Sequence, residues 1–387
     1  MLESTVQPPL RKSKNIFFEN INGLRFVGFL LVYIPHAFPY LLTDSKIKSV
    51  ILNFILDSVF KQGNGVSLFF VISGFFVTLK LLKELDKTAS INLKRFYLYR
   101  ITRIWPLYFA FLFFSFVVYP YAVSIYQHPT NYCSRPTLYF LFLSNFDVIR
   151  IAHTCKGYHV PFTLITWSVG VQEQFYFLFP FFFKWLPKKA LPLLLGFVVM
   201  ASIIFKIIYI EDEVKVYYHT ISISADIAMG ALGAYFIYTK PSFRYSFNRM
   251  SPQTFYMLVG LGMLFFLTQS LFNNFIYAII LRKLLLTSFY TLVILILTHH
   301  PKGKSFSFKP AFINFWGTYT YGLYFFHLIF LTLIDVILRI FGIDTNNVPV
   351  ILAIGLLALL FSMAGSYISF HYFESKFLKL RSLFLKK

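Results

Sequence analysis

The sequence predicts an all-α protein, a polytopic bundle of about ten transmembrane helices with both termini in the cytoplasm. Of its 387 residues, 57% are hydrophobic and only 13% are charged, whereas soluble domains carry about 25% charged residues. Apolar runs recur along the whole chain, and each is long enough to cross the hydrocarbon core of a bilayer. A soluble fold would expose far too much apolar surface to water.

The apolar runs divide the chain into spans, tails and one long connection. We expect a cytoplasmic N-terminal tail over residues 1–20, one membrane domain over 21–377 and a basic cytoplasmic tail over 378–387. The first residues lack the pattern of a cleaved signal peptide, and no repeat or second soluble domain is visible. The predicted spans are 24–42, 65–82, 104–123, 163–183, 190–209, 220–238, 254–271, 276–298, 312–338 and 349–370.

The eighth span is the weakest of these predictions. It contains two adjacent basic residues, Arg282 and Lys283, close to its start. Charged side chains are costly in the membrane interior. The span could therefore begin later, with residues 272–283 lying along the outer interface.

The basic residues orient the bundle. The formal net charge is +21, and most Lys and Arg residues fall in segments that ten spans place on one side. By the positive-inside rule, that side is cytoplasmic. The same placement, in short clusters between apolar runs, argues against a nucleic-acid partner. The basic segments are the N-terminal tail with Arg11, Lys12 and Lys14, then 80–103, 184–189, 240–249, 302–309 and the C-terminal tail.

Both cysteines, Cys133 and Cys155, lie in the longest polar connection, residues 124–161, which is predicted to be outside. An oxidising compartment permits a disulfide there. Three histidines lie nearby in the sequence: His128, His153 and His159. A zinc site is conceivable, but the spacing matches no standard zinc pattern. We expect a disulfide or two free thiols, and no metal.

The first span carries two ionisable residues, Arg25 and His36. Their separation of eleven residues is close to three helical turns, so both share one face about 16 Å apart along the axis. Arg25 is then near the cytoplasmic entrance and His36 is past the midplane, just after a proline that bends the helix. Intramembrane ionisable residues are functional candidates. The alternative is a snorkelling arginine and a histidine with a structural hydrogen bond.

The start of the third span, "RFYLYRITRIW", places Arg100 and Arg103 on one helix face. Arg95 adds a third charge. The planar guanidinium matches phosphate oxygens, which predicts a phosphate-binding edge at the cytoplasmic surface. Ordinary positive-inside charge or contact with lipid headgroups is the alternative.

Two later spans carry further polar groups. "TWSVGVQEQFYFLFP" brings Glu173 to the start of an apolar helix, where it needs a partner or rests at the interface near the helix N-terminus. "GTYTYGLYFFHLIF" places Tyr321, Tyr324 and His327 on one stripe. A histidine or arginine next to Glu173 would make it useful in proton transfer. A buried neutral histidine bonded to a carbonyl is the alternative for His327.

Taken together, these segments resemble the acyltransferase family 3 membrane domain. The matching segments occur in the family's order and extend from residue 21 to about 377. They are "INGLRFVGFLLVYIPHAF", "SLFFVISGFFVT", "RFYLYRITRIWPLYF", "TWSVGVQEQFYFLFP", "GTYTYGLYFFH" and "SYISFHYFESKF".

Three departures from the family pattern are visible. Gln172 stands where the family often has a first acid, which leaves Glu173 as the candidate there. Ser375 and Lys376 follow Glu374 where an arginine-proline or similar pair is common, which we expect to affect packing or anchoring. No SGNH-type esterase domain follows, so we do not expect the fused two-domain mechanism.

The resemblance implies a bacterial inner-membrane enzyme that moves an acyl group, usually acetyl, from cytoplasmic acyl-CoA to a hydroxyl of an extracytoplasmic or lipid-linked glycan. Arg25, Arg100 and Arg103 would hold the CoA head, with no tightly bound cofactor. His36 would act as general base or acyl carrier, and Glu173 or His327 would orient it or relay its proton. We expect four residues to contact the substrate: Trp167, Ser168, Tyr321 and Tyr324.

Two other function classes are compatible with ten spans and buried polar groups. A transporter or flippase for a lipid-linked glycan is one, although no matching pair of broken spans marks an inverted repeat. A non-catalytic sensor or scaffold is the other. Only the enzyme would acylate a glycan when supplied with acyl-CoA.

Overall fold

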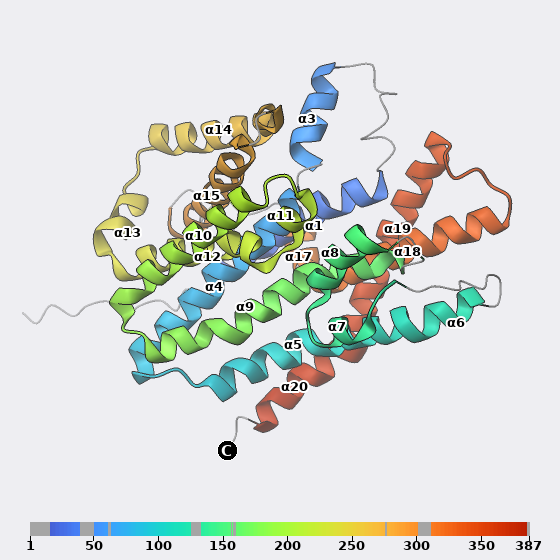
Figure 1. Cartoon of the computed structure of the whole chain (residues 1–387). Coiled ribbons are helices and arrows are strands. Elements are labelled where there is room, and N and C mark those ends of the chain that lie inside the picture. The colour runs from blue at the N-terminus through green and yellow to red at the C-terminus, as the bar shows by residue number, and fades with distance from the viewer. Residues whose placement is uncertain are drawn as a thin grey trace, which may run out of the picture.

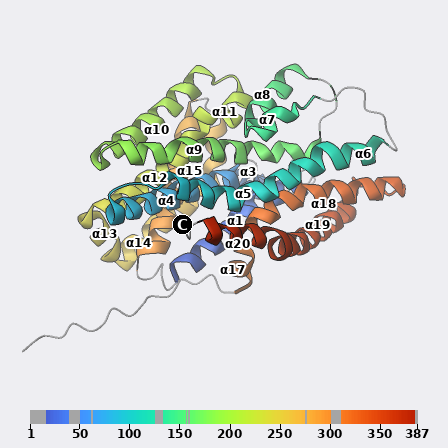
Figure 2. The ribbon, with the colours of Figure 1, turned by 90° about the horizontal axis from the view of Figure 1, so that it is seen from below.

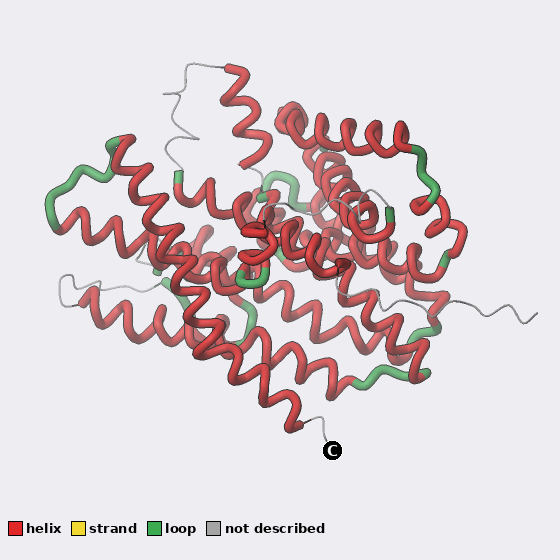
Figure 3. Tube along the Cα trace, turned by 180° about the vertical axis from the view of Figure 1, so that it is seen from behind, coloured by secondary structure: helices red, strands yellow, loops and turns green. Residues whose placement is uncertain are grey.

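The computed structural model describes residues 16–38, 50–60, 63–124, 133–155, 157, 160–274, 277–300 and 311–384. These residues form helices and connecting loops, without a strand among them (Figure 3). The predicted helical bundle is confirmed. The extreme tails and the basic segment 302–309 lie outside the described residues, as do Arg11, Lys12 and Lys14.

Each predicted span overlaps one long helix. The long helices are α1 (Ile16–Ala37), α4 (Asn64–Thr88), α5 (Leu93–Phe113), α9 (Thr166–Trp185), α10 (Leu191–Ile208), α12 (Thr220–Thr239), α14 (Pro252–Thr268), α15 (Ala278–His299), α18 (Thr320–Ile340) and α19 (Val348–Ser369). Among the described residues, 8 helices are long and apolar enough to cross a membrane, and the apolar part of α1 is shorter. The count of ten and the sides of the termini stay predictions.

Shorter helices connect and extend these. They are α3 (Val50–Phe60), α6 (Tyr119–Ser124), α7 (Pro136–Phe140), α8 (Ser144–Thr154), α11 (Glu213–Tyr218), α13 (Pro241–Asn248), α17 (Ala311–Gly317) and α20 (Ser375–Phe384). Single π-helical turns, Phe114–Val118 and Phe370–Glu374, join α5 to α6 and α19 to α20. Short 3-10 turns cover Pro161–Ile165, Lys188–Ala190 and Gln269–Asn274.

The centre of the bundle depends on close contact between α4 and α12. A Cβ atom on Gly74 would lie 1.9 Å from the carbonyl oxygen of Ile227, and one on Gly230 would lie 2.1 Å from that of Val71. Glycine at both positions therefore lets the two backbones touch, as small residues do between membrane helices. Helix α12 packs against both α10 and α4. Seen from below, α10, α9, α12 and α4 lie one below another on the left, and α18 packs along α19 on the right (Figure 2).

The last helix lies at the predicted cytoplasmic end of the bundle. α20 packs along the first half of α5 (Figure 1). The π-helical turn before α20 brings the buried Glu374 to Arg103 of α5, at 3.8 Å. Ser375 donates to the carbonyl of His371. The family departure at Ser375 is thus compatible with a continuous helix.

Whether residues 272–283 lie along the outer interface stays a prediction, but the helix of the eighth span includes both basic residues. α15 begins at Ala278, and both Arg282 and Lys283 turn into the bundle. They do so because polar partners from neighbouring helices lie there, so the charges need not face lipid.

The connection between α6 and α9 contains two short helices, α7 and α8, and a disulfide. Cys133 and Cys155 are bonded, with their Cα atoms 6.0 Å apart. This outcome selects the disulfide over two free thiols. His128 and His159 lie outside the described residues, and within those that are described no group of three or more His, Cys, Asp or Glu residues is gathered as for a metal ion.

Candidate active site

A cavity of about 220 Å³ extends from the arginines at the predicted cytoplasmic end of α1 and α5 to Val66 near the predicted outer end of α4. Its walls come from α1, α4, α5, α9 and the start of α18. All three arginines singled out by the sequence, Arg25, Arg100 and Arg103, line it. Two helices, α1 and α5, therefore bring these three guanidinium groups to one space.

Helix α5 supplies two of these arginines on one face. Its N-terminus is fixed at Asn92, whose side chain accepts from the backbone N–H of Arg95 at 2.9 Å, a standard N-cap. Arg100 then lies with its guanidinium carbon 4.0 Å from the ring centroid of Tyr176. That aromatic residue also lines the cavity. A cation over an aromatic ring remains available to an anion in the cavity.

The other two arginines differ in their partners. Arg25 donates to the side-chain oxygen of Asn22 at 3.3 Å. Arg103 faces the buried carboxylate of Glu374 and donates to the carbonyl of Thr318 at 3.4 Å. The positive charge of Arg103 is thus partly balanced within the chain, whereas Arg25 has a neutral hydrogen-bond partner.

Helix α18 continues the site away from the arginines. Tyr321 and Tyr324 line the cavity. The hydroxyl of Tyr321 donates to the carbonyl of Ile104 at 2.7 Å. The hydroxyl of Tyr324 lies 2.7 Å from that of Ser168, which also lines the cavity. One helical turn further on, the His327 ring centroid lies 5.8 Å from that of Tyr324.

His36 and His327 form a pair. The Nδ1 atom of His36 lies 3.0 Å from Nε2 of His327, and the two rings stack at 5.3 Å with 19° between their planes. His327 is fully buried, whereas the side chain of His36 is exposed. The pair therefore joins an inaccessible ring to one that keeps accessible surface.

The second nitrogen of His327 determines the direction of this hydrogen bond. Nδ1 of His327 lies 3.2 Å from the carbonyl of Leu323, and a carbonyl can only accept. When both rings are neutral, Nδ1 of His327 must donate and its Nε2 must accept from His36. The proton of His36 is then on Nδ1, and the lone pair on its Nε2 is left for chemistry.

The first helix connects the arginine cavity to the histidine pair. α1 is continuous from Ile16 to Ala37, so Arg25 and His36 are separated by about 16 Å of unbroken helix. Arg25 lines the cavity while His36 meets α18. The predicted separation of three helical turns agrees with this continuous helix, and the two depths in the membrane stay predictions.

Two predicted residues lie apart from the histidine pair. Glu173 accepts a hydrogen bond from Trp105 Nε1 through its Oε2 atom at 2.9 Å. Its Oε1 atom has no hydrogen-bond partner among the described residues. The structure thus brings His327, and not Glu173, to His36. Trp167 packs against Phe70 and the tyrosines of α11, with ring centroids 5.1–6.0 Å apart.

The sequence reasoning missed other polar residues in this cavity. Gln172, noted only as a departure from the family pattern, donates to the hydroxyls of Ser73 and Tyr176. All three line the cavity with the arginines. The signal was the rule already applied to Glu173, that polar side chains in a membrane helix face the bundle interior.

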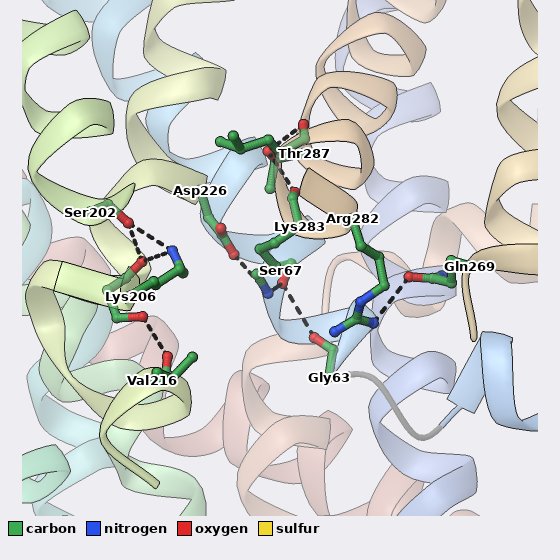
Figure 4. A network of polar contacts seen from close by, with 12 residues as sticks. Gly63, Ser67, Ser202, Lys206, Val216, Asp226, Gln269, Arg282, Lys283 and Thr287 are labelled. Atoms are coloured by element: carbon green, nitrogen blue, oxygen red, sulfur yellow. Dashed lines mark hydrogen bonds and ion pairs between the residues drawn. The ribbon is translucent and has the colours of Figure 1, made fainter. Parts of the chain in front are cut away.

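A second polar network lies between α4, α10, α12 and α15 (Figure 4). Asp226 of α12 forms an ion pair with Lys283 of α15 at 3.2 Å, and Lys283 also donates to Ser67. Lys206 of α10 donates to Ser202 and to the carbonyl of Ser222. We call Lys206, Asp226, Arg282 and Lys283 the Asp226 network. Lys206 and Asp226 were visible in the sequence as charges within apolar runs.

Comparison with known proteins places the chain among membrane acyltransferases. The family model described as "Acyltransferase domain" matches residues 18–367. The chain is 29% identical over 300 residues to the peptidoglycan O-acetyltransferase OatA of Listeria monocytogenes, covering 71% of this chain and 46% of that protein. It is 26% identical over 284 residues to the O-acetyltransferase OatA of Staphylococcus aureus, covering 68% of this chain and 45% of that protein.

The chain spans a little less than half the length of these curated relatives. No solved structure matches it significantly.

Proposed function

Because this chain belongs to acyltransferase family 3, we propose that it is an O-acetyltransferase of a bacterial plasma membrane, with acyl-CoA as donor and a glycan hydroxyl as acceptor. The donor binds from the cytoplasm, and the acceptor is an extracytoplasmic or lipid-linked glycan. The names of the relatives, peptidoglycan O-acetyltransferase and O-acetyltransferase, favour acetyl as the group and a cell-wall glycan as the acceptor.

One observation carries this proposal: an exposed histidine pairs with a buried one at the end of a tyrosine stripe that begins in an arginine-lined cavity. The cavity supplies positive charge for the phosphates of a donor. The tyrosines lead from that charge to the imidazole. The accessible ring of His36 then meets the acceptor hydroxyl.

The cavity fits only part of the donor. Ligand pockets usually enclose about 300–1,000 Å³, and this one encloses about 220 Å³. We assign to it the narrow pantetheine arm of acyl-CoA, with Arg25 and Arg100 on the phosphates at its mouth. About 16 Å of helix separates Arg25 from His36, a span that an extended arm of this kind can cover.

In the proposed reaction, His36 acts as general base. Its Nε2 atom accepts the proton of the acceptor hydroxyl while the hydroxyl oxygen bonds to the thioester carbonyl carbon. The carbon–sulfur bond then breaks, and CoA leaves as a thiolate that takes from His36 the proton of the acceptor hydroxyl, which restores the neutral imidazole. His327 has a positioning role. It accepts from Nδ1–H of His36, and that hydrogen bond strengthens when His36 becomes an imidazolium.

The test uses purified protein in lipid vesicles with acetyl-CoA and a cell-wall oligosaccharide. His36→Ala should lower acetyl transfer by about 10²–10⁴-fold, the usual contribution of a general base, with acetyl-CoA binding retained. His153→Ala is the matched control, since His153 is an exposed histidine paired with Asp212 outside the site. Full activity of His36→Ala would sink the proposal.

A second pair of variants tests the role of His327. His327→Gln keeps a side chain that can accept from His36, and His327→Phe does not. The glutamine variant should retain more activity than the phenylalanine variant, and its pH profile should stay closer to that of the wild type. A hydroxylamine-sensitive acetyl label on His36 would instead assign the acyl-carrier role.

A further inference from the structure

Three cations gather around one tyrosine beside the cavity. The ring centroid of Tyr99 lies 4.0 Å from Nζ of Lys80, and 4.4 Å and 5.8 Å from the guanidinium carbons of Arg381 and Arg95. These residues come from α4, α20 and α5, so the folded bundle and not one basic sequence run assembles them. We call them the Tyr99 cluster.

The chain provides little negative charge to balance this cluster. In the described parts of α4, α5 and α20, the acidic side chains are Glu84 and Asp86. Glu84 accepts from the backbone N–H of Asn92 and is the one of these carboxylates within electrostatic range of Lys80, whereas Asp86 is bound by Lys188. Beyond the end of α19, Glu374 faces Arg103. Like charges so close repel one another, so the arrangement favours an anion from outside the chain.

The cluster continues directly into the cavity. Tyr99 precedes Arg100 in α5, and Lys80 lies within electrostatic range of Arg95, Arg100 and Arg381. The Arg100 guanidinium lies over Tyr176, a cavity wall residue. Lys80 and Arg95 are exposed at the surface. A ligand that enters the cavity with one end can therefore keep its other end on the Tyr99 cluster.

The proposed donor has a chemistry that fits this division. CoA carries a thin pantetheine arm, a diphosphate and, at the far end of its nucleotide, a 3′-phosphate. The cavity is too small for the whole molecule. Arginine and lysine side chains bind phosphate oxygens by charge-assisted hydrogen bonds, and a tyrosine ring between them keeps them together through cation–π contacts.

We propose that the Tyr99 cluster is a phosphate-binding subsite that takes the 3′-phosphate of the acyl donor, outside the cavity that holds its arm. This inference rests on the proposed function, because that function identifies the donor. It adds three residues, Lys80, Arg95 and Arg381, to the donor site. Arg381 lies beyond the residues that the family model matches.

The test is equilibrium binding of CoA and of dephospho-CoA, which lacks the 3′-phosphate, to full-length protein in phosphatidylcholine nanodiscs. Wild-type protein should bind CoA about tenfold more tightly, the effect of one charge-assisted contact. Lys80→Gln and Arg381→Gln should each weaken CoA binding by about tenfold and change dephospho-CoA binding by less than about twofold.

Arg249→Gln is the matched control. Arg249 also lies over a tyrosine ring, that of Tyr245 at 5.2 Å, on the same predicted side of the membrane. It has no place in the cavity or the cluster, so this variant should bind both ligands as the wild type does. Equal losses of CoA and dephospho-CoA binding in the two cluster variants would overturn the 3′-phosphate assignment.

Two further outcomes separate the possible causes of failure. Nanodiscs with phosphatidylglycerol provide the same phosphate chemistry in a lipid headgroup. If the cluster variants lose only their response to that lipid and bind CoA normally, the subsite belongs to lipid and the inference is overturned. If wild-type protein binds neither CoA form, the proposed donor is wrong and the subsite fails with it. Equal binding of both forms overturns the subsite alone.

Discussion

Two groups of basic side chains lie inside this bundle, and they differ in what surrounds their charge. In the Asp226 network, Lys283 faces the Asp226 carboxylate and a serine hydroxyl, and Lys206 is held by a hydroxyl and a carbonyl. In the cavity, Arg25 and Arg100 face an amide oxygen and an aromatic ring. The residue types are similar, but the partners are not.

The difference separates a structural use of charge from a binding use. A buried cation is costly without compensation. The Asp226 network supplies this compensation from α4, α10 and α12, and so ties those helices to α15 (Figure 4). The cavity arginines are compensated less by the chain and have open space before them. Charge that the protein leaves unbalanced next to a cavity is the better indicator of a ligand.

The largest effect is expected from removing the anion of the Asp226 network. The Asp226 carboxylate is fully buried. Asp226→Ala removes the negative charge that pairs with Lys283 and that lies within electrostatic range of Lys206. Breaking such a pair costs about 3–5 kcal/mol. The variant should lose most of its folded population in detergent, measured by thermal unfolding monitored with size-exclusion chromatography.

The control for this prediction removes both partners. Asp226→Ala combined with Lys283→Met should recover much of the stability, because an apolar pair is close to neutral where a broken ion pair is not. Any folded single variant should bind acetyl-CoA as the wild type does. If Asp226→Ala is stable but cannot bind acetyl-CoA, the network belongs to the donor site, and its charges do not have the purely structural role that the comparison assigns to them.

For the cavity arginines we expect the opposite result, with little change in stability and a large loss of acetyl-CoA binding. Arg100→Ala should leave thermal stability nearly unchanged, because its guanidinium contacts rings. It should weaken acetyl-CoA binding by about 10–100-fold, the loss of one or two charge-assisted contacts. Binding isotherms in nanodiscs measure this effect. Arg103→Ala should also weaken acetyl-CoA binding more than acceptor binding, as its place in the cavity implies.

Lys188→Ala is the control for Arg100, since Lys188 is basic, on the same predicted side and paired with Asp86 outside the cavity. Its acetyl-CoA affinity should be that of the wild type. A loss of affinity in Lys188→Ala equal to that in Arg100→Ala would mean that general surface charge, and not the cavity, attracts the donor.

The sequence predicted the helices well because membrane spans leave a strong signal. Backbone groups in hydrocarbon must be satisfied within the segment, so each apolar run of sufficient length becomes a helix. The eighth predicted span is the weakest in the sequence because of the charges of Arg282 and Lys283, yet the helix runs through both residues from Ala278. Their compensation by Asp226 and Gln269 comes from distant parts of the chain, which a local pattern does not reveal.

The sequence also placed much of the candidate site. The spacing of Arg25 and His36 and the stripe from Tyr321 to His327 are helical periodicities, and each helix keeps its own periodicity after folding. Contact between helices is a different matter. That His327 rather than Glu173 meets His36, and that Arg381 reaches Tyr99, depends on the packing of α18 on α1 and of α20 on α5.

Ionic strength should also distinguish the cavity arginines from the Asp226 network, through a smaller effect on acetyl-CoA binding. Open charges are screened by salt, whereas buried pairs are screened much less. Raising the salt concentration from about 0.05 M to 0.5 M should raise the Kd for acetyl-CoA several-fold. The difference in thermal stability between wild type and Asp226→Ala should stay the same over that range. A salt-independent Kd would argue against donor recognition through the cavity arginines.

The smallest expected effect is a gain, rather than a loss, of acetyl-CoA affinity. Glu374 is buried and faces Arg103 at 3.8 Å, so this carboxylate competes with donor phosphate for the arginine. Glu374→Gln keeps the shape of the side chain and an oxygen for Ser369, which donates to Glu374 at 3.2 Å, but removes the charge. The variant should bind acetyl-CoA about two- to fivefold more tightly at low salt, as expected for a partly exposed ion pair worth about 1 kcal/mol or less.

Asp86→Asn, which removes a carboxylate bound by Lys188 outside the cavity, should have no such effect. If Glu374→Gln weakens binding instead, Glu374 orients Arg103 toward the donor, and the cavity then shares the internal compensation that distinguishes the Asp226 network.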